Sequence, residues 1–528
     1  MKKIENIAYY LFLGVLFVAV SSCGNDISRE DKVSTIISQV EDPIAILNMV
    51  PGEIIKKSGV SDGALPYTQK MMLDFFITDS LTGVDYDVDV QIIMGGGTQF
   101  TPNFYGIFKL KDEAAFIELL TTEANAKVAE QDGFKYVIKD SDMYVIVWND
   151  EFVIASNIPM SMSSMMGGSG SKEGKKTVDK LIGFINSADE EPVTTYSEFL
   201  SNDADISLHL MGEGMYAYIA GMSMDEESEL EKSREMLEAS SGDMFIRFND
   251  GDISIQILSS LSDKLIAQMN MWNETAVNAK YLAFGSSSQP MYTMGSSMNV
   301  EKFVKEAQSE DALFDAGMLI KELEKMGLTL NDANNALDGD VFFVLDRLEI
   351  KKEVIDWGYG DPYVIYNPTP IFSIAAGVKD MGIIQNIFAK FDSVSAGLYK
   401  NGDAYLTCVN NVLFTTNDST WAANFMSGNT VQIKDAEGVF TDKPFGLYLD
   451  FAKIAEMPDM GDEKALIEMM KYAKGLGDVN EMNLSFVFKD DSRNALRILT
   501  ESISRMSEEK PQTEEALEIQ SELEEAIQ

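Results

Sequence analysis

The sequence predicts an α+β protein, with antiparallel sheets that carry helices on one face and with an internal duplication into two similar halves. Two observations predict this class. Strand-like apolar runs recur at regular spacing with only a few helical patterns among them, which favours antiparallel sheets. The same order of units also occurs twice along the chain: strand-helix, strand-helix-two-strand, strand-helix and hairpin.

The N-terminal segment predicts an export signal that ends at a cysteine. Lys2 and Lys3 precede an apolar run from Ile7 to Val20, which is shorter than the roughly 20 apolar residues that span a bilayer. Small residues then lead to Cys23. This order is typical of a lipoprotein signal peptide over 1–22, so we expect Cys23 to bear lipid with fatty acyl chains such as palmitate. The alternative is an ordinary signal peptide with a chance cysteine at its end.

The segment 23–40 is predicted to be an acidic tether. Asp26, Glu30 and Asp31 follow the cysteine closely, which is similar to the surface-export signal of Bacteroidota-type lipoproteins. A tether can also be acidic for solubility alone. Gly24 stands where inner-membrane lipoproteins of enteric-type bacteria commonly have Asp, so we expect a lipid anchor in the outer membrane and leave the membrane face open.

Composition excludes several classes of function. The chain of 528 residues has 85 acidic and 42 basic residues, a net charge of −43, and therefore repels nucleic acids and anionic headgroups. With one histidine and two cysteines, it offers no zinc site rich in those residues. We expect no metal and no cofactor.

The two halves are expected over 41–285 and 286–506. Phe104–Asp112 and Ile371–Asp380 each end in Lys-Asp and lead into a helical segment. Each copy then has two closing strands, the last of which ends in Asn157 or Asn417. Asn and Asp in the turns supply the positive φ that tight hairpins need.

Other units complete the predicted repeat. Strand-helix units are expected near 43–57, 204–220, 290–307 and 444–456. The hairpin 244–258 is matched with a second hairpin over 482–499. A flexible joint is expected at 285–290, and a mobile loop rich in Met, Ser and Gly at 160–177. Residues 507–528 predict an acidic amphipathic helix, either docked on the domain or binding a partner.

Three features of the chain together resemble a family of large Bacteroidota-type envelope lipoproteins. They are the lipoprotein signal, the opening unit from Asp42 to Gly59, and Asp338-Gly339-Asp340 leading into the run 341–345. The main domain of that family is known only as a domain of unknown function. The resemblance implies an envelope location and a duplicated fold, and it brings no catalytic residues.

Candidate catalytic and metal residues have structural alternatives. His209 is the only histidine, so a Ser-His-Asp triad would need it, but we expect a surface or half-buried strand histidine instead. Asp85, Asp87 and Asp89 have the spacing of a calcium loop but lack its Gly and Glu, and their alternation predicts a strand with Asp outward. Cys408 is expected to be a buried apolar residue of a strand.

Two glycine clusters, 95–97 and 167–170, are expected to be loops rather than phosphate sites, because the Gly-Lys-Ser/Thr pattern is missing. The methionine clusters at 160–166 and 222–224 are expected to reflect core filling or biased loop composition, with an apolar-ligand surface or copper(I) site as alternatives.

Aromatic residues give the best binding candidates. Trp357, Tyr359 and Tyr363 lie in a segment rich in Gly and Pro. These residues, with Trp148 and Trp272, are expected to form a small satellite core, and stacking on a sugar is the alternative.

We therefore expect a non-enzymatic, lipid-anchored envelope protein that acts as a binding or assembly module, with an envelope protein or a glycan as partner. One alternative is a carrier of an apolar ligand, which would show an apolar cavity between the half-sheets. The other is an enzyme acting on glycans through two carboxylates about 5 to 10 Å apart in one pocket.

Overall fold

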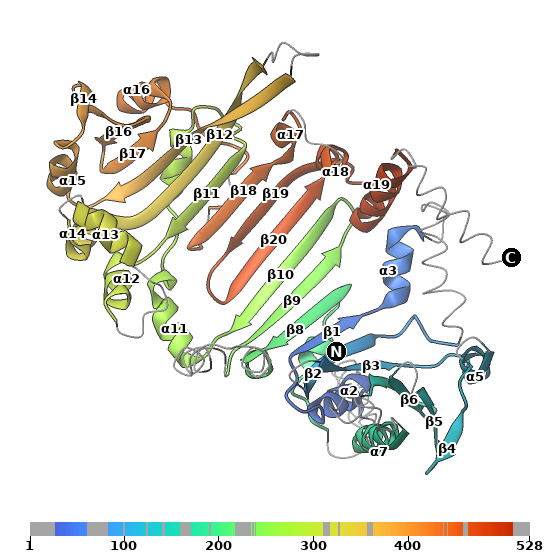
Figure 1. Ribbon diagram of the computed structural model, residues 1–528. Helices are drawn as coiled ribbons and strands as arrows, with labels where there is room; N and C mark the ends of the chain where they lie inside the picture. The colour runs from blue at the N-terminus through green and yellow to red at the C-terminus, as the bar shows by residue number, and fades with distance from the viewer. Residues whose placement is uncertain are drawn as a thin grey trace, which may run out of the picture. The chain divides into compact units, whose positions relative to one another are not determined.

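The computed structural model describes most of the chain between Ile27 and Glu509. The described ranges are 27–60, 83–98, 101–122, 125–139, 143–158, 171–188, 192–216, 234, 237, 239–309, 317–325, 328–355, 363–436, 438–440, 442–457 and 463–509. The chain folds into two compact units (Figure 1). Unit 1 comprises Met1–Asn48, Thr82–Asp203 and Ala217–Met222, and unit 2 comprises Met49–Leu81, Ala204–Tyr216 and Ser223–Gln528.

Unit 1 is a sheet with helices. Its strands pair in the order β1-β2-β3-β7-β6-β5-β4. They are β1 (Ala45–Met49, whose last residue is assigned to unit 2), β2 (Val90–Thr98), β3 (Thr101–Phe108), β4 (Ala129–Gln131), β5 (Phe134–Lys139), β6 (Tyr144–Trp148) and β7 (Val153–Asn157). Its helices are α2 (Arg29–Ser38), α5 (Glu113–Thr122), α7 (Ser171–Ser187) and α8 (Ser197–Leu200). A core of Phe116, Leu120, Val137, Trp148 and Val153 holds α5 on the sheet.

Unit 2 contains a larger antiparallel sheet, in the order β8-β9-β10-β20-β19-β18-β11-β12-β13-β17-β16-β15-β14 (Figure 1). The strands are β8 (Ile206–Met211), β9 (Ser241–Phe248), β10 (Asp252–Ser260), β11 (Tyr292–Ser297), β12 (Leu337–Ile355), β13 (Tyr363–Val378), β14 (Asp392–Ser395), β15 (Leu398–Asn401), β16 (Ala404–Val409), β17 (Val412–Thr416), β18 (Phe445–Asp450), β19 (Met470–Gly477) and β20 (Glu481–Phe488).

The helices of unit 2 are α3 (Pro51–Ser58), α11 (Asp263–Met269), α12 (Val300–Ala307), α13 (Gly317–Lys325), α14 (Leu330–Ala336), α15 (Met381–Phe388), α16 (Ser419–Ser427), α17 (Phe451–Ile454), α18 (Glu463–Met469) and α19 (Ala495–Glu509), with the 3-10 turns η2 (Asn270–Trp272) and η3 (Ala279–Phe284). A core that includes Tyr281, Phe342, Phe414 and Trp421 lies between the sheet and α16, η3 and the loop 433–440. The α+β class with helices packed on a large antiparallel sheet is thus confirmed.

Side-chain caps explain where several helices begin. The side chain of Asn299 accepts the backbone N–H of Lys302 at the start of α12. Thr329 and Asp332 form a capping box at α14. Asp418 caps α16, which ends at Gly428 with a φ of 74°. These caps are local signals, because each acts within a few residues of its helix end.

The strand pairing repeats along the chain. The strands β1-β2-β3-β7-β6-β5-β4 of unit 1 pair in the same chain order as β11-β12-β13-β17-β16-β15-β14 of unit 2. Within unit 2, β8-β9-β10 also matches β18-β19-β20, and the two sets join through β10 and β20. The strands β12 and β13 are longer than their counterparts β2 and β3 in unit 1. They continue to pair beyond the residues that pair with β11 and β17, from Leu348 opposite Pro370 out to Ile355 opposite Tyr363 (Figure 1).

The N-terminal tether prediction is wrong for residues 29–38. This segment is helix α2, and its Val33, Ile36 and Ile37 side chains are at most 1% exposed. The side-chain oxygens of Ser34 and Thr35 accept the backbone N–H groups of Tyr196 and Val193. The helix therefore belongs to the body of unit 1.

The expected boundary at residue 285 does not separate the units. The segments 204–216 and 239–285 belong to unit 2, although the repeat pattern predicts them in the first half. The expected joint at 285–290 is also part of this unit, because Gly285 and Val431 exchange two backbone hydrogen bonds and Ser287 donates to Asp346. A segment rich in Gly and Ser can be ordered when its backbone groups find partners.

Two smaller predictions are also wrong. Residues 482–499 are not a hairpin, because β20 pairs with β19 and residues from Ala495 onward form α19. The loop expected over 160–177 includes the first residues of α7, which begins at Ser171; residues 160–170 lie outside the described residues.

Candidate functional site

The predicted lipidation and stacking residues fall largely outside the described residues. This applies to Cys23, Trp357 and Tyr359, and to the glycine and methionine clusters at 160–170 and 222–224. Tyr363 begins β13, where its backbone pairs with Ile355. Residues 510–528 of the predicted C-terminal helix are likewise outside the described part of the chain.

Trp148 and Trp272 are accounted for by packing. Trp148 is fully buried in the core of unit 1, where its Nε1 donates to Glu113 over 2.9 Å. Trp272 lies 5.6 Å from the ring of Phe445, measured between centroids. The Trp148 ring therefore offers no exposed platform for a sugar.

His209 lies on β8 opposite Asp243 of β9, and its Nδ1 is 2.6 Å from the carboxylate oxygen. This is a cross-strand pair in a regular antiparallel ladder.

Cys408 is half-buried on β16, and its Sγ is 3.1 Å from the Sδ of Met381. Burial raises the pKa of the Cys408 thiol to about 11. A thiol that stays protonated near neutral pH is a poor nucleophile.

The aspartates at 85, 87 and 89 do not form the expected strand. Residues 85–89 form a turn, Asp87 pairs with Lys111 over 3.3 Å, and burial raises the pKa of Asp89, which lies near Arg29. The prediction failed because alternation over five residues also fits a turn. No group of three or more His, Cys, Asp or Glu side chains among the described residues could hold a metal ion.

Glycines 95 and 96 lie within β2, not in a loop, and serve close packing. A Cβ on Gly95 would come within 2.6 Å of Val40, and the N–H of Gly96 donates to the carbonyl oxygen of Glu41.

None of the helices in the described part of the chain has the length and hydropathy to cross a membrane.

The sequence did not reveal the most extensive candidate surface, which is one face of the unit 2 sheet. The strand registers align a row of side chains across nine neighbouring strands. From β8 to β13 this row consists of Ile206, Ile246, Ile255, Leu484, Gly475, Leu447, Met294, Phe343 and Ile374. Residues directly opposite one another in antiparallel strands share a face, so the row forms one continuous apolar line.

Two flanking rows on the same face are also free of charged residues. One contains Phe248, Ile253, Phe486, Ala473, Leu449, Tyr292, Leu345 and Phe372, and the other contains Leu208, Met244, Ile257, Met482, Gly477, Phe445, Ser296, Val341 and Ala376. We name these three rows the apolar face.

In the part of the chain that the structure describes, the apolar face is not covered as a core would be. Met294 is 44% exposed, Ile374 39% and Val341 37%, whereas the alternating residues Phe342 and Val344 are almost fully buried on the opposite side. At one end α19 packs against Ile253 and Phe488. Partly exposed aliphatic side chains in contiguous rows mark a binding surface more often than a random patch does.

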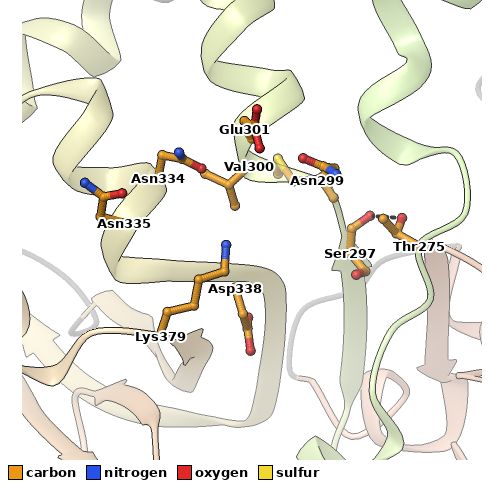
Figure 2. Close-up of a pocket in the computed structure, with 10 residues that line it drawn as sticks. Thr275, Ser297, Asn299, Val300, Glu301, Asn334, Asn335, Asp338 and Lys379 are labelled. Atoms are coloured by element: carbon orange, nitrogen blue, oxygen red, sulfur yellow. Dashed lines mark hydrogen bonds between the residues drawn. The ribbon is translucent and has the colours of Figure 1, made fainter.

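A polar cavity of about 460 Å3 is a second candidate, on unit 2 (Figure 2). It lies where β11 leads into α12. The end of α14, the start of β12, and Lys379, which follows β13, complete its lining. Its lining residues are Thr275, Ser297, Met298, Asn299, Val300, Glu301, Asn334, Asn335, Asp338 and Lys379.

Backbone contacts hold the cavity walls together. The N–H of Met298 donates to the carbonyl oxygen of Gly339, and the N–H of Lys379 donates to that of Ala336 over 2.7 Å. Thr275 donates to the carbonyl oxygen of Ser297 (Figure 2). In the same view the Lys379 ammonium points into the space between Asn334 and Val300.

The charged groups differ in how they are paired. Lys305 donates to the Glu301 carboxylate over 2.7 Å and lowers the pKa of Glu301. Asp338 accepts the N–H of Asp340, and its carboxylate lies 3.9 Å from the Lys280 ammonium. Lys379 forms no ion pair within 4.0 Å among the described residues, although its charge also lowers the pKa of Glu301.

The carboxylates in and beside the cavity differ in the direction of their pKa shifts. Glu301 is held ionised by Lys305. Burial raises the pKa of Asp340, but this residue accepts from Ser297 over 2.7 Å and does not line the cavity. The lining of the cavity, which is mostly polar, is suited to a polar ligand.

No protein-family model matches the sequence, and no curated protein matches it. Among solved structures the chain is similar to TP0453 in crystal form IV, at 7% identity and a TM-score of 0.25, over 41% of this chain and 76% of that chain. Crystal form I of TP0453 gives 8% identity and a TM-score of 0.25, over 47% and 82% of the two chains. A TM-score of 0.25 identifies neither a shared fold nor a shared function.

Proposed function

We propose that this chain is a lipid-anchored cell-envelope protein that binds a ligand with acyl chains on the apolar face of unit 2. The observation that carries the proposal is the partly exposed row from Ile206 to Ile374, which crosses nine strands. At about 4.8 Å between strands, eight steps give a line of roughly 38 Å. An extended acyl chain can lie within this length.

The chemistry of the face favours acyl chains over a protein partner. Its backbone N–H and C=O groups are used inside the sheet, so only side chains meet a ligand. The central row is almost entirely Ile, Leu, Met and Phe, whereas binding hot spots of protein interfaces are enriched in Trp, Tyr and Arg. Burial of each methylene contributes about 0.8 kcal/mol, so about ten buried methylenes give roughly 8 kcal/mol of favourable transfer free energy, which offsets the cost of association.

The location is proposed from the lipid signal together with the packing of α2. Only residues 24–28 lie between Cys23 and the first residue of this helix, Arg29. Five residues reach about 18 Å when extended. If Cys23 bears lipid, unit 1 is held close to the bilayer surface rather than on a long tether.

The internal duplication also stays a proposal. It is supported by the matching order of strand pairing and by equivalent contacts of Asn157 and Asn417. Each Asn accepts from a Phe N–H and donates to a Pro carbonyl oxygen: Phe104 and Pro102 in one copy, Phe372 and Pro370 in the other. The Lys-Asp pairs also make equivalent contacts. The backbone N–H groups of Lys111 and Asp112 both donate to the carbonyl oxygen of Gly83, and those of Lys379 and Asp380 both donate to that of Ala336.

The test measures binding of the fluorescent fatty acid cis-parinaric acid to the full-length chain carrying Cys23→Ala, so that the protein's own lipid cannot fill the face. The double variant Met294→Glu/Ile374→Glu introduces two charges at exposed positions, and we expect at least about tenfold weaker binding. The matched control is Val394→Glu, because Val394 is 51% exposed on β14 outside the apolar face. Equal affinity of all three proteins, or no binding by the parent, would overturn the proposal.

A further inference from the structure

We propose that the polar cavity of unit 2 binds a small zwitterion, with an amino acid or short peptide as the chemical class. The inference is independent of the apolar face, because the cavity is formed by other residues. Its volume of about 460 Å3 falls within the range of small-molecule sites, roughly 300 to 1,000 Å3.

One end of the cavity suits a carboxylate. At the start of α12, the side chain of Asn299 accepts the N–H of Lys302, and its carbonyl oxygen accepts the N–H of Phe303. The backbone N–H groups of Val300 and Glu301 have no acceptor among the described residues. Such a helix start attracts negative charge. Lys379 adds an ammonium that points into the same space and has no ion-pair partner within 4.0 Å among the described residues (Figure 2).

The cavity also holds groups for an ammonium. The Glu301 carboxylate pairs with Lys305, but both side chains are more than 60% exposed, and an exposed pair of this kind is weak enough for a ligand ammonium to compete. Asp338 lies 3.9 Å from its nearest lysine, Lys280, which is longer than a charge-assisted hydrogen bond.

Overall charge favours a neutral zwitterion. The chain carries a net charge of −43, which repels a free anion, and a simple cation would leave Lys379 uncompensated. A zwitterion satisfies both ends of the cavity without a net electrostatic penalty. The carboxamides of Asn334 and Asn335 can donate to and accept from peptide groups, while Met298 and Val300 are the only apolar lining residues, which favours small side chains.

The experiment is calorimetry with the dipeptide Ala-Ala and two capped forms: N-acetyl-Ala-Ala, which lacks the ammonium, and Ala-Ala amide, which lacks the carboxylate. The protein is the full-length chain with Cys23→Ala. We expect Ala-Ala to bind about tenfold or more tightly than either capped form, because each cap removes one charge-assisted contact.

Two variants separate the ends of the site. Lys379→Gln should remove the preference for Ala-Ala over its amide and keep the preference over the N-acetyl form. Glu301→Gln should remove the preference for Ala-Ala over the N-acetyl form and keep the preference over the amide. Lys434→Gln, an exposed lysine of unit 2 outside the cavity, should leave all three affinities unchanged. Absence of Ala-Ala binding, equal binding of the three peptides, or an equal loss for all of them in Lys379→Gln would overturn the inference.

Discussion

The side-chain amide of Asn417 donates to the carbonyl oxygen of Pro370 over 2.6 Å, and its Oδ1 accepts the N–H of Phe372. One side chain thus satisfies two backbone groups where β13 passes the end of β17. Asn157 makes the same two contacts with Pro102 and Phe104 in unit 1. Asn157 is the last residue of β7, and Asn417 directly follows β17.

Replacement of this Asn should destabilise the unit that contains it. We expect Asn417→Ala to lower the free energy of unfolding of unit 2 by about 1–3 kcal/mol, because two backbone groups lose their partner. Asn157→Ala should have a similar effect on unit 1. Urea titration followed by tryptophan fluorescence measures both. Asn429→Ala is the control, since its Nδ2 bonds only an exposed serine side chain, and an equally large loss there would contradict the prediction.

The close approach at Gly339 predicts a second stability effect. Gly339 has a φ of 105°, and a Cβ there would collide with the carbonyl oxygen of Met298. We expect Gly339→Ala to destabilise unit 2 by more than about 3 kcal/mol, from backbone strain together with the collision. Gly402→Ala isolates the strain, because its φ is 60° and nothing lies within 4 Å of the added Cβ. Thermal denaturation of the two variants should therefore differ, and equal losses would refute the collision.

Cys408 should react slowly until the solution is strongly alkaline. Burial raises the pKa of its thiol to about 11, and only the thiolate attacks a reagent such as iodoacetamide. We expect the alkylation rate to rise through pH 9 to 11 in the folded chain. In the chain unfolded with urea, the rise should centre on the ordinary thiol pKa of about 8.5. Identical pH profiles for the two states would contradict the burial effect.

Lipidation of Cys23 has its own test. Cys23→Ala should abolish fatty-acid labelling and move the protein to the soluble fraction of lysed cells. Ser22→Ala is a suitable control, because it changes a neighbouring residue without removing the thiol that receives the lipid. Continued labelling of Cys23→Ala would refute the assignment.

Local sequence signals are reliable wherever the structure depends on near neighbours. The strand-helix units near 43–57 and 290–307 are present as β1 with α3 and as β11 with α12. The hairpin turn at Asn410-Asn411 has φ values of 51° and 61°, as its sequence predicts. Caps and turns operate within a few residues, so they can be read without the fold, whereas the short alternation at 85–89 did not form a strand.

Predictions that required a long-range partner failed. An apolar run with a following turn predicts a second hairpin at 482–499, but β20 pairs with β19 and the next segment forms α19. The acidic character of 29–38 predicts a solvated segment, yet its few apolar residues are buried in unit 1. Neither the pairing partner of a strand nor the packing partner of a short helix is encoded locally.

The sequence alone determined the α+β class, and it predicts an export signal that ends at Cys23 and a repeated order of units. Only the tertiary structure decided which surfaces are available to a ligand. The apolar face joins residues as distant as Ile206 and Leu484, and the cavity joins Thr275 to Lys379. Alternation along a strand shows that one side is apolar. Whether that side is covered by a helix or left exposed depends on the register of non-local strands and on the positions of the packed helices.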